Sequence, residues 1–394
     1  MRKPELQLDE ERLLEVAEGR AGLGDFGDGG FRKPLRRLLE HLKAEEELAP
    51  ATRTAAVETI TELLVDRLRF VADRKRYPIA EERIERPILI TGQARSGTTL
   101  MHSLLGEDPA NRLPRFWEVV RPSPPVGFAE ADDPRIEQGN ADMQTFIARM
   151  KRGMASHPYW DEEGMMPVEC TRLSTIDFRN MSAMAFWRVP ISKGWVLSSD
   201  VRAHYAFHKK MLQNLQYGAD RARWVMKGAA HYTQLEEALE TYPDAIILWM
   251  HRDPVKAISS RLELEAIMAE GITGQPVDRA ARAVGQLAAA QRSLEAVLSD
   301  PLVEHPAVFH IRFVDWVGDP IATLRRVYQH FDLEFTRKAE EGMKRWLSDP
   351  KNKSDRYGRF RYSLEPFGMS ADEMDELFRP YRERFGLPRE LPAA

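Results

Sequence analysis

Residues 88–101 read ILITGQARSGTTLM, and this stretch decides the fold. The apolar run 88–90 is typical of a buried strand in a parallel sheet. Gly97 lets the backbone approach a ligand closely, and an apolar helix start follows it. Because a helix N-terminus attracts negative charge, the stretch predicts a strand, a loop that cradles an anion and then a helix.

Four polar side chains complete the predicted anion loop over residues 92–99. Ser96, Thr98 and Thr99 supply hydroxyl groups, and Arg95 supplies a cation. The loop is not a Walker A motif, because the Gly-Lys-Ser/Thr ending is absent and Arg95 takes the place of a nearby lysine. We therefore expect the loop to bind a phosphate or sulfate group, and the protein need not be an ATPase.

Composition bounds the class of protein. The 394 residues are 43% hydrophobic and 30% charged, which is typical of a globular protein with a sizeable core. A net charge of −4 argues against a general nucleic-acid binder. Cys170 is alone, so no intramolecular disulfide forms, and neither a membrane span nor a signal peptide is visible. We expect a cytoplasmic protein.

The first 86 residues are predicted to be a helical extension, and residues 87–394 the main domain. A glycine-rich break, 22–30, separates the first helix from the second. We interpret the extension as a helical cap on the main domain, with a partner-binding or dimerising arm as the alternative. Apolar residues recur at helical spacing at Leu35, Leu38, Leu39 and Leu42 and at Val57, Ile60, Leu64 and Leu68.

Strands and helices alternate after residue 87. Such alternation predicts an α/β fold with a central parallel sheet flanked by helices. The prolines of residues 121–127 exclude regular structure there. Strands are expected at 88–91, 245–250 and 307–313, a short strand before His231, and helices at 98–106, 135–156, 172–215, 255–262, 278–298 and 321–332.

A second candidate site follows the strand 245–250. Arg252, then Asp253-Pro254 and a helix, place a guanidinium at the carboxyl edge of the sheet, where open α/β sheets bind ligands. Ser260 lies eight positions later, about two turns into the helix, and can share an anion with Arg252. The alternative is a local ion pair in which Arg252 and Asp253 cap the helix.

Together, the two sites resemble the sulfotransferases that use 3′-phosphoadenosine-5′-phosphosulfate (PAPS). Residues 93–100 resemble that family's 5′-phosphosulfate loop, and Arg252 with Ser260 resembles its 3′-phosphate pair, at 252–260. The resemblance spans roughly 87–370. It implies a P-loop-like α/β fold, PAPS as donor, adenosine 3′,5′-bisphosphate (PAP) as product, and no metal. Other stretches resemble the bacterial branch of this family, namely Asp108-Pro109, Trp117-Glu118, the segment 224–254 and Tyr362-Ser363-Leu364-Glu365.

Two residues depart from the cytosolic branch of that family. Arg95 stands where a lysine stabilises charge on the bridging oxygen. Leu100 stands where a tryptophan stacks on adenine, so the adenine platform is expected to come from elsewhere.

A basic segment, 351–362, lies near the C-terminus. Its residues 351–361 contain five basic side chains and one acid, Asp355, within an acidic protein. The resemblance implies a flap over the donor, with Arg356, Tyr357 and Gly358 near the 3′-phosphate. The alternative is a solvated loop with no ligand.

The acceptor needs a base that removes its hydroxyl or amine proton. His231 lies four residues after Lys227, between a short strand and a helix, and Glu118 follows Trp117. Both are candidates for the base, and Lys227 is expected to assist at the transferring sulfuryl group. The sequence has no paired cysteines that would suggest a metal.

The acceptor pocket is expected to draw on residues 113–170 and 180–210. Aromatic and methionine side chains are typical of apolar pockets, which favours a small hydrophobic alcohol or phenol, although ordinary core packing explains such residues too. The pocket candidates are Phe116, Trp117, Phe128, Met165, Met166, Phe186 and Trp187.

Two other functions compete with sulfotransfer. A P-loop nucleotide kinase or phosphotransferase requires a loop lysine and a magnesium-binding acid, and neither is evident. A non-catalytic nucleotide-binding protein requires only the cradle. A small-molecule acceptor is the expected partner, nucleic acid is not expected, and a homo-oligomer is left open.

Overall fold

The computed structural model describes residues 8–44, 50–128, 132–179, 200–220 and 222–390, and the chain forms two compact units. The first unit comprises residues 1–84, 114–149 and 162–221, and the second comprises 85–113, 150–161 and 222–394. The predicted boundary between residues 86 and 87 lies close to the first passage from one unit to the other. Two later segments also belong to the first unit.

The first unit is helical in its described parts. The apolar positions predicted for the helices of residues 1–86 are buried, which confirms the periodicity. The unit contains α1 (Glu10–Ala21), α2 (Arg32–Ala44), α3 (Pro50–Arg76), α5 (Phe116–Val120), α6 (Pro134–Arg149) and α7 (Val201–Gln216).

One predicted helix of this region is too long. The helix expected at 135–156 ends at Arg149, where the chain passes into the second unit and begins a tight turn at Lys151–Gly153. Of the helices expected around 172–215, the described residues contain α7, which begins at Val201, and short helical turns at Cys170–Arg172 and Thr175–Asp177. Phe178 has a φ of 57°, a left-handed conformation that cannot continue a helix. Residues 180–199 lie outside the described part of the chain.

Arg67 of α3 organises the core of the first unit. Its side chain is buried, and its Nη1 donates to the Asp177 carboxylate at 2.7 Å. Its Nε donates to the carbonyl of Phe26 at 2.9 Å, and the guanidinium lies 4.1 Å from the Phe31 ring centroid. The glycine-rich break between α1 and α2 therefore supplies acceptors for a buried cation, because an unpaired buried charge is strongly unfavourable.

We predict that Arg67→Ala lowers the free energy of unfolding by about 3–5 kcal/mol, because it breaks a buried ion pair and leaves Arg179 as the remaining ionic partner of Asp177. Urea denaturation followed by circular dichroism measures the change. Arg69→Ala is the matched control: Arg69 is half exposed on the same helix, and its loss should cost less than about 0.5 kcal/mol. Equal effects of the two substitutions would contradict the assignment.

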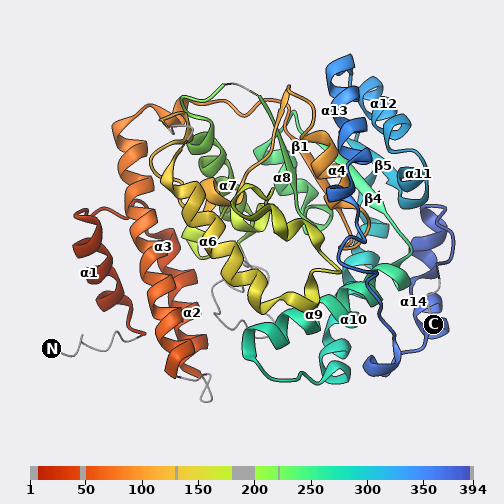
Figure 1. Ribbon diagram of the computed structural model, residues 1–394, viewed down its shortest axis with the longest axis horizontal. Helices are drawn as coiled ribbons and strands as arrows, with labels where there is room; N and C mark the ends of the chain where they lie inside the picture. The colour runs from red at the N-terminus through yellow and green to blue at the C-terminus, as the bar shows by residue number, and fades with distance from the viewer. Residues whose placement is uncertain (1–7, 45–49, 129–131, 180–199, 221, 391–394) are drawn as a thin grey trace. The chain divides into compact units, whose positions relative to one another are not determined.

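The second unit is built on a parallel five-stranded sheet with the order β2-β3-β1-β4-β5, which confirms the predicted fold class. Figure 1 shows α9 and α10 side by side at one end of this unit, and α11, α12 and α13 together at the other. The strands are β1 (Ile88–Gly92), β2 (Asn111–Arg112), β3 (Arg223–Lys227), β4 (Ile246–His251) and β5 (Val308–Arg312). The helices are α4 (Thr98–Leu105), α8 (Leu235–Thr241), α9 (Pro254–Thr273), α10 (Arg279–Ser299), α11 (Phe313–Gly318), α12 (Pro320–His330), α13 (Arg337–Ser348) and α14 (Ala371–Arg384).

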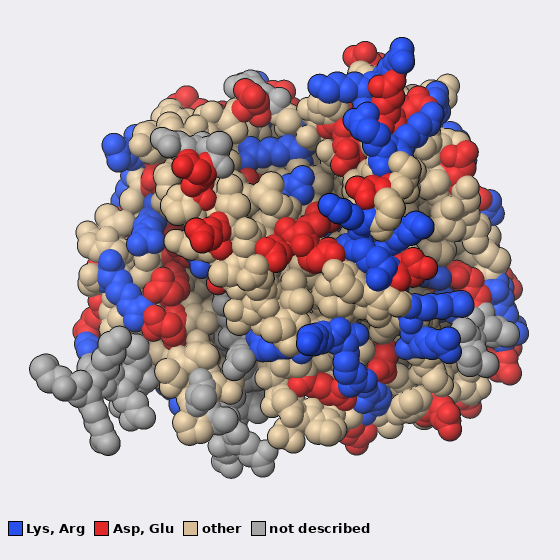
Figure 2. Space-filling view, in the orientation of Figure 1, with Lys and Arg blue, Asp and Glu red and all other residues tan. Residues whose placement is uncertain are grey.

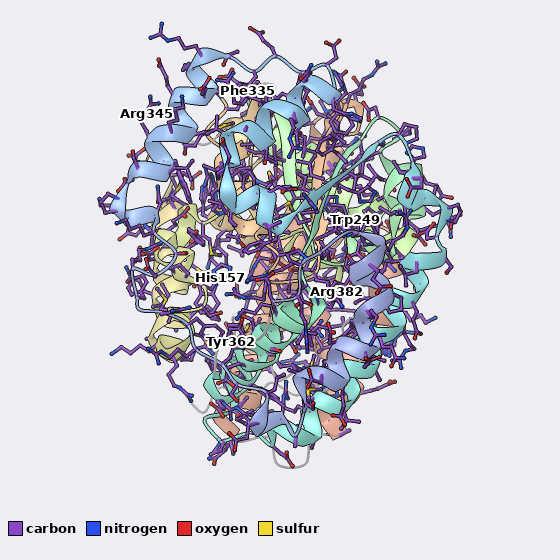
Figure 3. The ribbon with its side chains drawn as sticks, turned by 90° about the vertical axis from the view of Figure 1, so that its right-hand side faces the viewer. His157, Trp249, Phe335, Arg345, Tyr362 and Arg382 are labelled. Carbon is purple, nitrogen blue, oxygen red and sulfur yellow. The ribbon has the colours of Figure 1, made fainter. Side chains whose placement is uncertain are left out.

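Both faces of this sheet are covered, which explains the continuous apolar runs of β1 and β4. Ile88 and Leu248 belong to the core cluster that contains side chains of α4, α12 and α13. Because side chains alternate along a strand, Trp249 points to the opposite face. Its ring lies 6.2 Å from that of Phe385, which follows α14, and Figure 3 labels Trp249 beside that helix. A strand buried on both faces has no polar alternation.

The strand order has a topological switch point between β1 and β4. The chain leaves β1 toward β2 on one side and leaves β4 toward β5 on the other. In open α/β sheets such a topological switch point lies at the carboxyl ends of the strands and holds the ligand. The loop 93–97 and Arg252 follow these two strands, so the topology brings the two predicted sites to one edge. No helix among the described residues is both long and apolar enough to cross a bilayer.

Candidate active site

The backbone of residues 92–97 has several positive φ values and passes close to β4. Gly92 and Gly97 have φ values of 135° and 88°, and a Cβ on Gly92 would overlap the carbonyl oxygen of Met250 in β4. Arg95 is also left-handed, at 77°. Ser96 closes the turn, because its N–H and Oγ both donate to the Gln93 carbonyl, at 3.2 and 2.7 Å. The loop thereby presents the N-terminus of α4.

Arg95 links the loop to two other segments of the second unit. Its Nε donates to Ser260 Oγ in α9 at 3.0 Å, and its Nη1 donates to the Ser156 carbonyl at 3.0 Å. Burial, and then repulsion by Arg252, lower the pKa of the Arg95 guanidinium. No carboxylate forms an ion pair with Arg95 among the described residues. A half-buried cation held only by neutral acceptors favours an anionic ligand.

Arg252 lies against the same loop. Its Nη1 donates to the Arg95 carbonyl at 2.9 Å, and its guanidinium lies 3.9 Å from the Phe313 ring centroid. The alternative of an Arg252–Asp253 ion pair is wrong, because Arg252 pairs with Glu390 at 2.8 Å. Asp253 does cap α9, accepting the N–H of Val255 at 3.1 Å.

Lys227 and His231 lie at the same edge of the sheet. Lys227, the last residue of β3, is buried, and its Nζ donates to Thr99 Oγ1 in the first turn of α4 at 3.2 Å. His231 is buried in the short turn that follows. That turn is tied to β1, because the N–H of Tyr232 donates to Thr91 Oγ1 at 2.9 Å. The structure thus brings the Lys227 side chain to the first turn of α4 and ties the turn of His231 to β1.

The basic segment 351–362 is anchored at Asp161. Arg356 Nη2 pairs with the Asp161 carboxylate at 2.6 Å, and the Tyr357 hydroxyl donates to it at 2.7 Å. Gly358 is exposed and has a φ of 90°. The predicted contact of these three residues with a 3′-phosphate stays a prediction. Figure 2 shows Lys and Arg side chains gathered on the face where the C-terminal part of the chain lies, and the exposed ones of this segment are Lys351, Lys353, Arg359 and Arg361.

Glu118 belongs to the first unit and has a structural contact there. It lies in the short helix α5, is buried, and accepts the N–H of Arg115 at 3.0 Å, which caps the helix. The neighbouring backbone is fixed by the N–H of Phe116, which donates to the Met166 carbonyl at 2.9 Å. One carboxylate oxygen therefore has a capping role that is independent of any chemistry.

The residues predicted for the acceptor pocket are divided between core and surface. Phe116, Trp117 and Met166 are buried, whereas Phe128 and Met165 are about half exposed. Phe186 and Trp187 lie outside the described residues. The first unit also contains a cavity of about 730 Å³, and about half of its lining residues are charged. Its charged lining residues are Glu58, Glu62, Asp66, Arg69, Arg121, Asp133, Arg135 and Asp142.

Several residues at this edge were missed by the sequence analysis. Ser156 and Glu390 touch Arg95 and Arg252 but are 61 and 138 residues away along the chain. The Gln93 side-chain amide and Ser156 Oγ are buried and bond to no group in the described part of the chain. A buried polar atom without a partner requires an explanation, and a bound ligand or water molecule is one such explanation. Gln93 could be identified from the sequence, because it lies inside the loop motif of residues 92–99.

A sulfotransferase family model matches residues 87–337. This range covers the sheet, the loop 93–97, Arg252 and Ser260. The chain therefore belongs to the sulfotransferase family, which confirms the resemblance and favours sulfotransfer over the kinase alternative.

Two named relatives are similar to this chain. The omega-hydroxy-beta-dihydromenaquinone-9 sulfotransferase Stf3 of Mycobacterium bovis is 23% identical over 319 residues, which make up 78% of this chain and 76% of that protein. The protein of the same name from Mycobacterium tuberculosis gives the same figures.

Solved structures confirm the fold. Sulfotransferase STF9 from Mycobacterium avium superposes with a TM-score of 0.82 at 24% identity, covering 97% of this chain and 98% of that one. Sulfotransferase STF1 from Mycobacterium tuberculosis H37Rv gives a TM-score of 0.74 at 24% identity, covering 96% and 100%.

A buried histidine relay supports the end of β4 just before Arg252. His310 Nε2 donates to the Val303 carbonyl at 2.9 Å, which makes His310 Nδ1 an acceptor for His251 Nε2 at 2.8 Å. The Tyr381 hydroxyl of α14 then donates to His251 Nδ1 at 2.7 Å. Burial lowers the pKa of both imidazoles, His251 well below its usual range, so the relay is neutral.

We predict that this relay makes the protein acid-sensitive. Below pH about 6.5 the unfolded histidines take up protons that the folded ones refuse, so stability falls by up to ~1.4 kcal/mol per pH unit for each imidazole. His251→Asn should flatten this slope below pH 6 in thermal melts. His330→Asn, at an exposed position, should not change it. An unchanged slope in His251→Asn would refute the prediction.

Proposed function

We propose that this protein transfers a sulfuryl group from PAPS to the hydroxyl of a small apolar alcohol or phenol. One observation supports the donor most directly: the loop after β1 and the residues after β4 are joined. Arg252 donates to the Arg95 carbonyl, and Arg95 donates to Ser260. Two guanidinium groups and a helix N-terminus at one sheet edge suit a nucleotide that carries phosphates at both ends.

The residues present fit the two charged ends of the donor. The first turn of α4, with Thr98 and Thr99, would hold the 5′-phosphosulfate. Arg252 and Ser260 would hold the 3′-phosphate. Phe313 and Phe360, whose rings face the Arg252 and Arg95 guanidinium groups, are our candidates for the adenine platform that Leu100 does not supply. The orphaned Gln93 amide adds a donor and an acceptor inside the loop.

The chemistry is an in-line displacement at sulfur. The acceptor oxygen forms a bond to sulfur while the bond from sulfur to the bridging phosphate oxygen breaks, and the base takes the acceptor proton. Lys227, held against the first turn of α4 by Thr99, would stabilise charge that develops on the transferring and leaving groups. By analogy with phosphoryl transfer, positioning and charge stabilisation are the main contributions of the protein.

Metal binding forms no part of the proposal. In the described ranges of the chain, no cluster of three or more His, Cys, Asp or Glu side chains could hold a metal ion.

An apolar acceptor is supported by one relative and by composition. The name of Stf3 gives a hydroxylated dihydromenaquinone as the acceptor of that protein. The aromatic and methionine side chains predicted for the pocket suit such chemistry. A ³⁵S-transfer screen from labelled PAPS across phenols, sterols, lipid alcohols, hydroxylated quinones and sugars tests the acceptor class. Transfer to sugars alone would contradict the apolar assignment.

We predict that Arg252→Ala weakens PAP binding by about 10–100-fold. The substitution removes charge-assisted hydrogen bonds of about 1.5–3 kcal/mol in total to the 3′-phosphate. Isothermal titration calorimetry measures the affinity, and adenosine 5′-monophosphate, which lacks that phosphate, should be affected little. Arg345→Ala, at an exposed position in α13, is the matched control. Unaltered PAP affinity in Arg252→Ala would overturn the donor assignment.

We propose His231 as the general base for two reasons. Its turn is hydrogen-bonded to β1 at the edge of the sheet where we place the donor, and Glu118 already caps α5. His231→Asn should lower kcat by about 10²–10⁴-fold. Glu118→Gln keeps an oxygen that can cap α5 and should lower kcat less than about tenfold. Steady-state ³⁵S-transfer rates decide between them, and the reverse order of effects would assign the base to Glu118.

A further inference from the structure

The strongest contact of Arg252 is with the C-terminal segment of the same chain. Glu390 accepts from Arg252 Nε at 3.1 Å and from Nη2 at 2.8 Å, a two-pronged pairing. The Arg252 and Glu390 side chains are only 16% and 23% exposed. The pair therefore lies largely out of solvent, where a charge pair is worth more than at the surface.

The Glu390 carboxylate uses the donors that a phosphate would use. A guanidinium has five N–H groups, and its Nε–Nη edge matches the two oxygens of a carboxylate or phosphate. On Arg252 this edge is taken by Glu390, and Nη1 donates to the Arg95 carbonyl. A 3′-phosphate that approaches Arg252 in the bidentate manner meets the Glu390 carboxylate at the same position.

Several other contacts hold the segment 387–390 in place. Arg389 pairs with Asp372 and Asp375 of α14, and Leu387 is buried. The Glu390 N–H donates to Asp253, the N-cap residue of α9. The segment 387–390 is thus held by a few polar contacts and one apolar side chain, which is a small interface.

We propose that Glu390 holds the position of the donor's 3′-phosphate on Arg252 and that PAPS or PAP binds by displacing the segment 387–390. This inference rests on the proposed function, because it requires a 3′-phosphate at Arg252. Glu390 then determines both the affinity and the selectivity for the 3′-phosphate. Two anions cannot share one guanidinium edge, so each molecule of donor competes with the tail.

The competition has a calculable effect on affinity. When the binding-competent state is only a fraction of the population, the apparent dissociation constant rises by the inverse of that fraction. A tail that is seated about 90% of the time weakens binding about tenfold. Nucleotides without a 3′-phosphate do not need the Arg252 edge and escape this effect.

The test compares Glu390→Gln with wild type by calorimetric titration of PAP and of adenosine 5′-monophosphate. Glutamine keeps the size of the side chain but loses its charge, so PAP should bind about tenfold more tightly while the monophosphate is unchanged. Glu383→Gln, an exposed carboxylate near the end of α14, is the matched control and should change neither affinity.

A role in which Glu390 merely orients Arg252 predicts the opposite sign. PAP affinity that falls or stays the same in Glu390→Gln would overturn the proposal. Failure of the proposed function looks different: wild type would then bind PAP no better than the monophosphate, and Arg252→Ala would change nothing. PAP binding that depends on Arg252 but not on Glu390 overturns this inference alone.

Hydrogen–deuterium exchange gives a second readout in the unmodified protein. Displacement frees the Glu390 N–H from Asp253, so the C-terminal peptide should exchange faster with PAP than with adenosine 5′-monophosphate. Slower exchange of that peptide with PAP would show that the tail stays seated and would refute the displacement.

Discussion

The parallel pairing of β1 with β4 is the constraint on which the donor edge depends. Five residue pairs hold the two strands in register, from Ile88 beside Ile246 to Gly92 beside Met250. At the last pair only a glycine fits, because any Cβ on Gly92 would overlap the Met250 carbonyl. This close approach brings the loop that follows β1 against Arg252, which follows β4. Without it, the two anion-binding elements would be separate sites.

The two guanidinium groups at this edge are compensated in different ways. Arg252 has a carboxylate partner, Glu390, and stays neutralised while it is largely buried. Arg95 has only hydroxyl and carbonyl acceptors from Ser260 and Ser156. A neutral acceptor stabilises a cation less than an anion does, so the loop retains net positive charge. That charge, rather than any single hydrogen bond, makes this edge of an acidic protein suited to an anion.

The sequence predicted the elements that a local residue pattern defines. It did not predict the contacts that form only when distant parts of the chain fold together. The strands that became β1 and β4 were predicted within two residues, because strands covered on both faces read as continuous apolar runs. β5, a partly buried edge strand, was predicted equally well from its apolar residues. The helix after residue 135 was overextended, because its periodicity continues past the point where the chain changes unit. Arg252 and Ser260 were predicted from their spacing across the start of α9, with Arg252 just before the helix and Ser260 inside it. Ser156 and Glu390 carry no such pattern, since only the fold brings them to the loop.

The placement of the base candidates follows the same division between local and tertiary signals. His231 lies four residues after a strand end, so the pairing of β3 with β1 fixes it at the donor edge. Glu118 is fixed by its own helix, through the Arg115 N–H. One oxygen of the Glu118 carboxylate is therefore committed to the helix end that it caps. The local helix explains the position of Glu118, whereas the position of His231 is explained by the same sheet edge that carries the loop after β1.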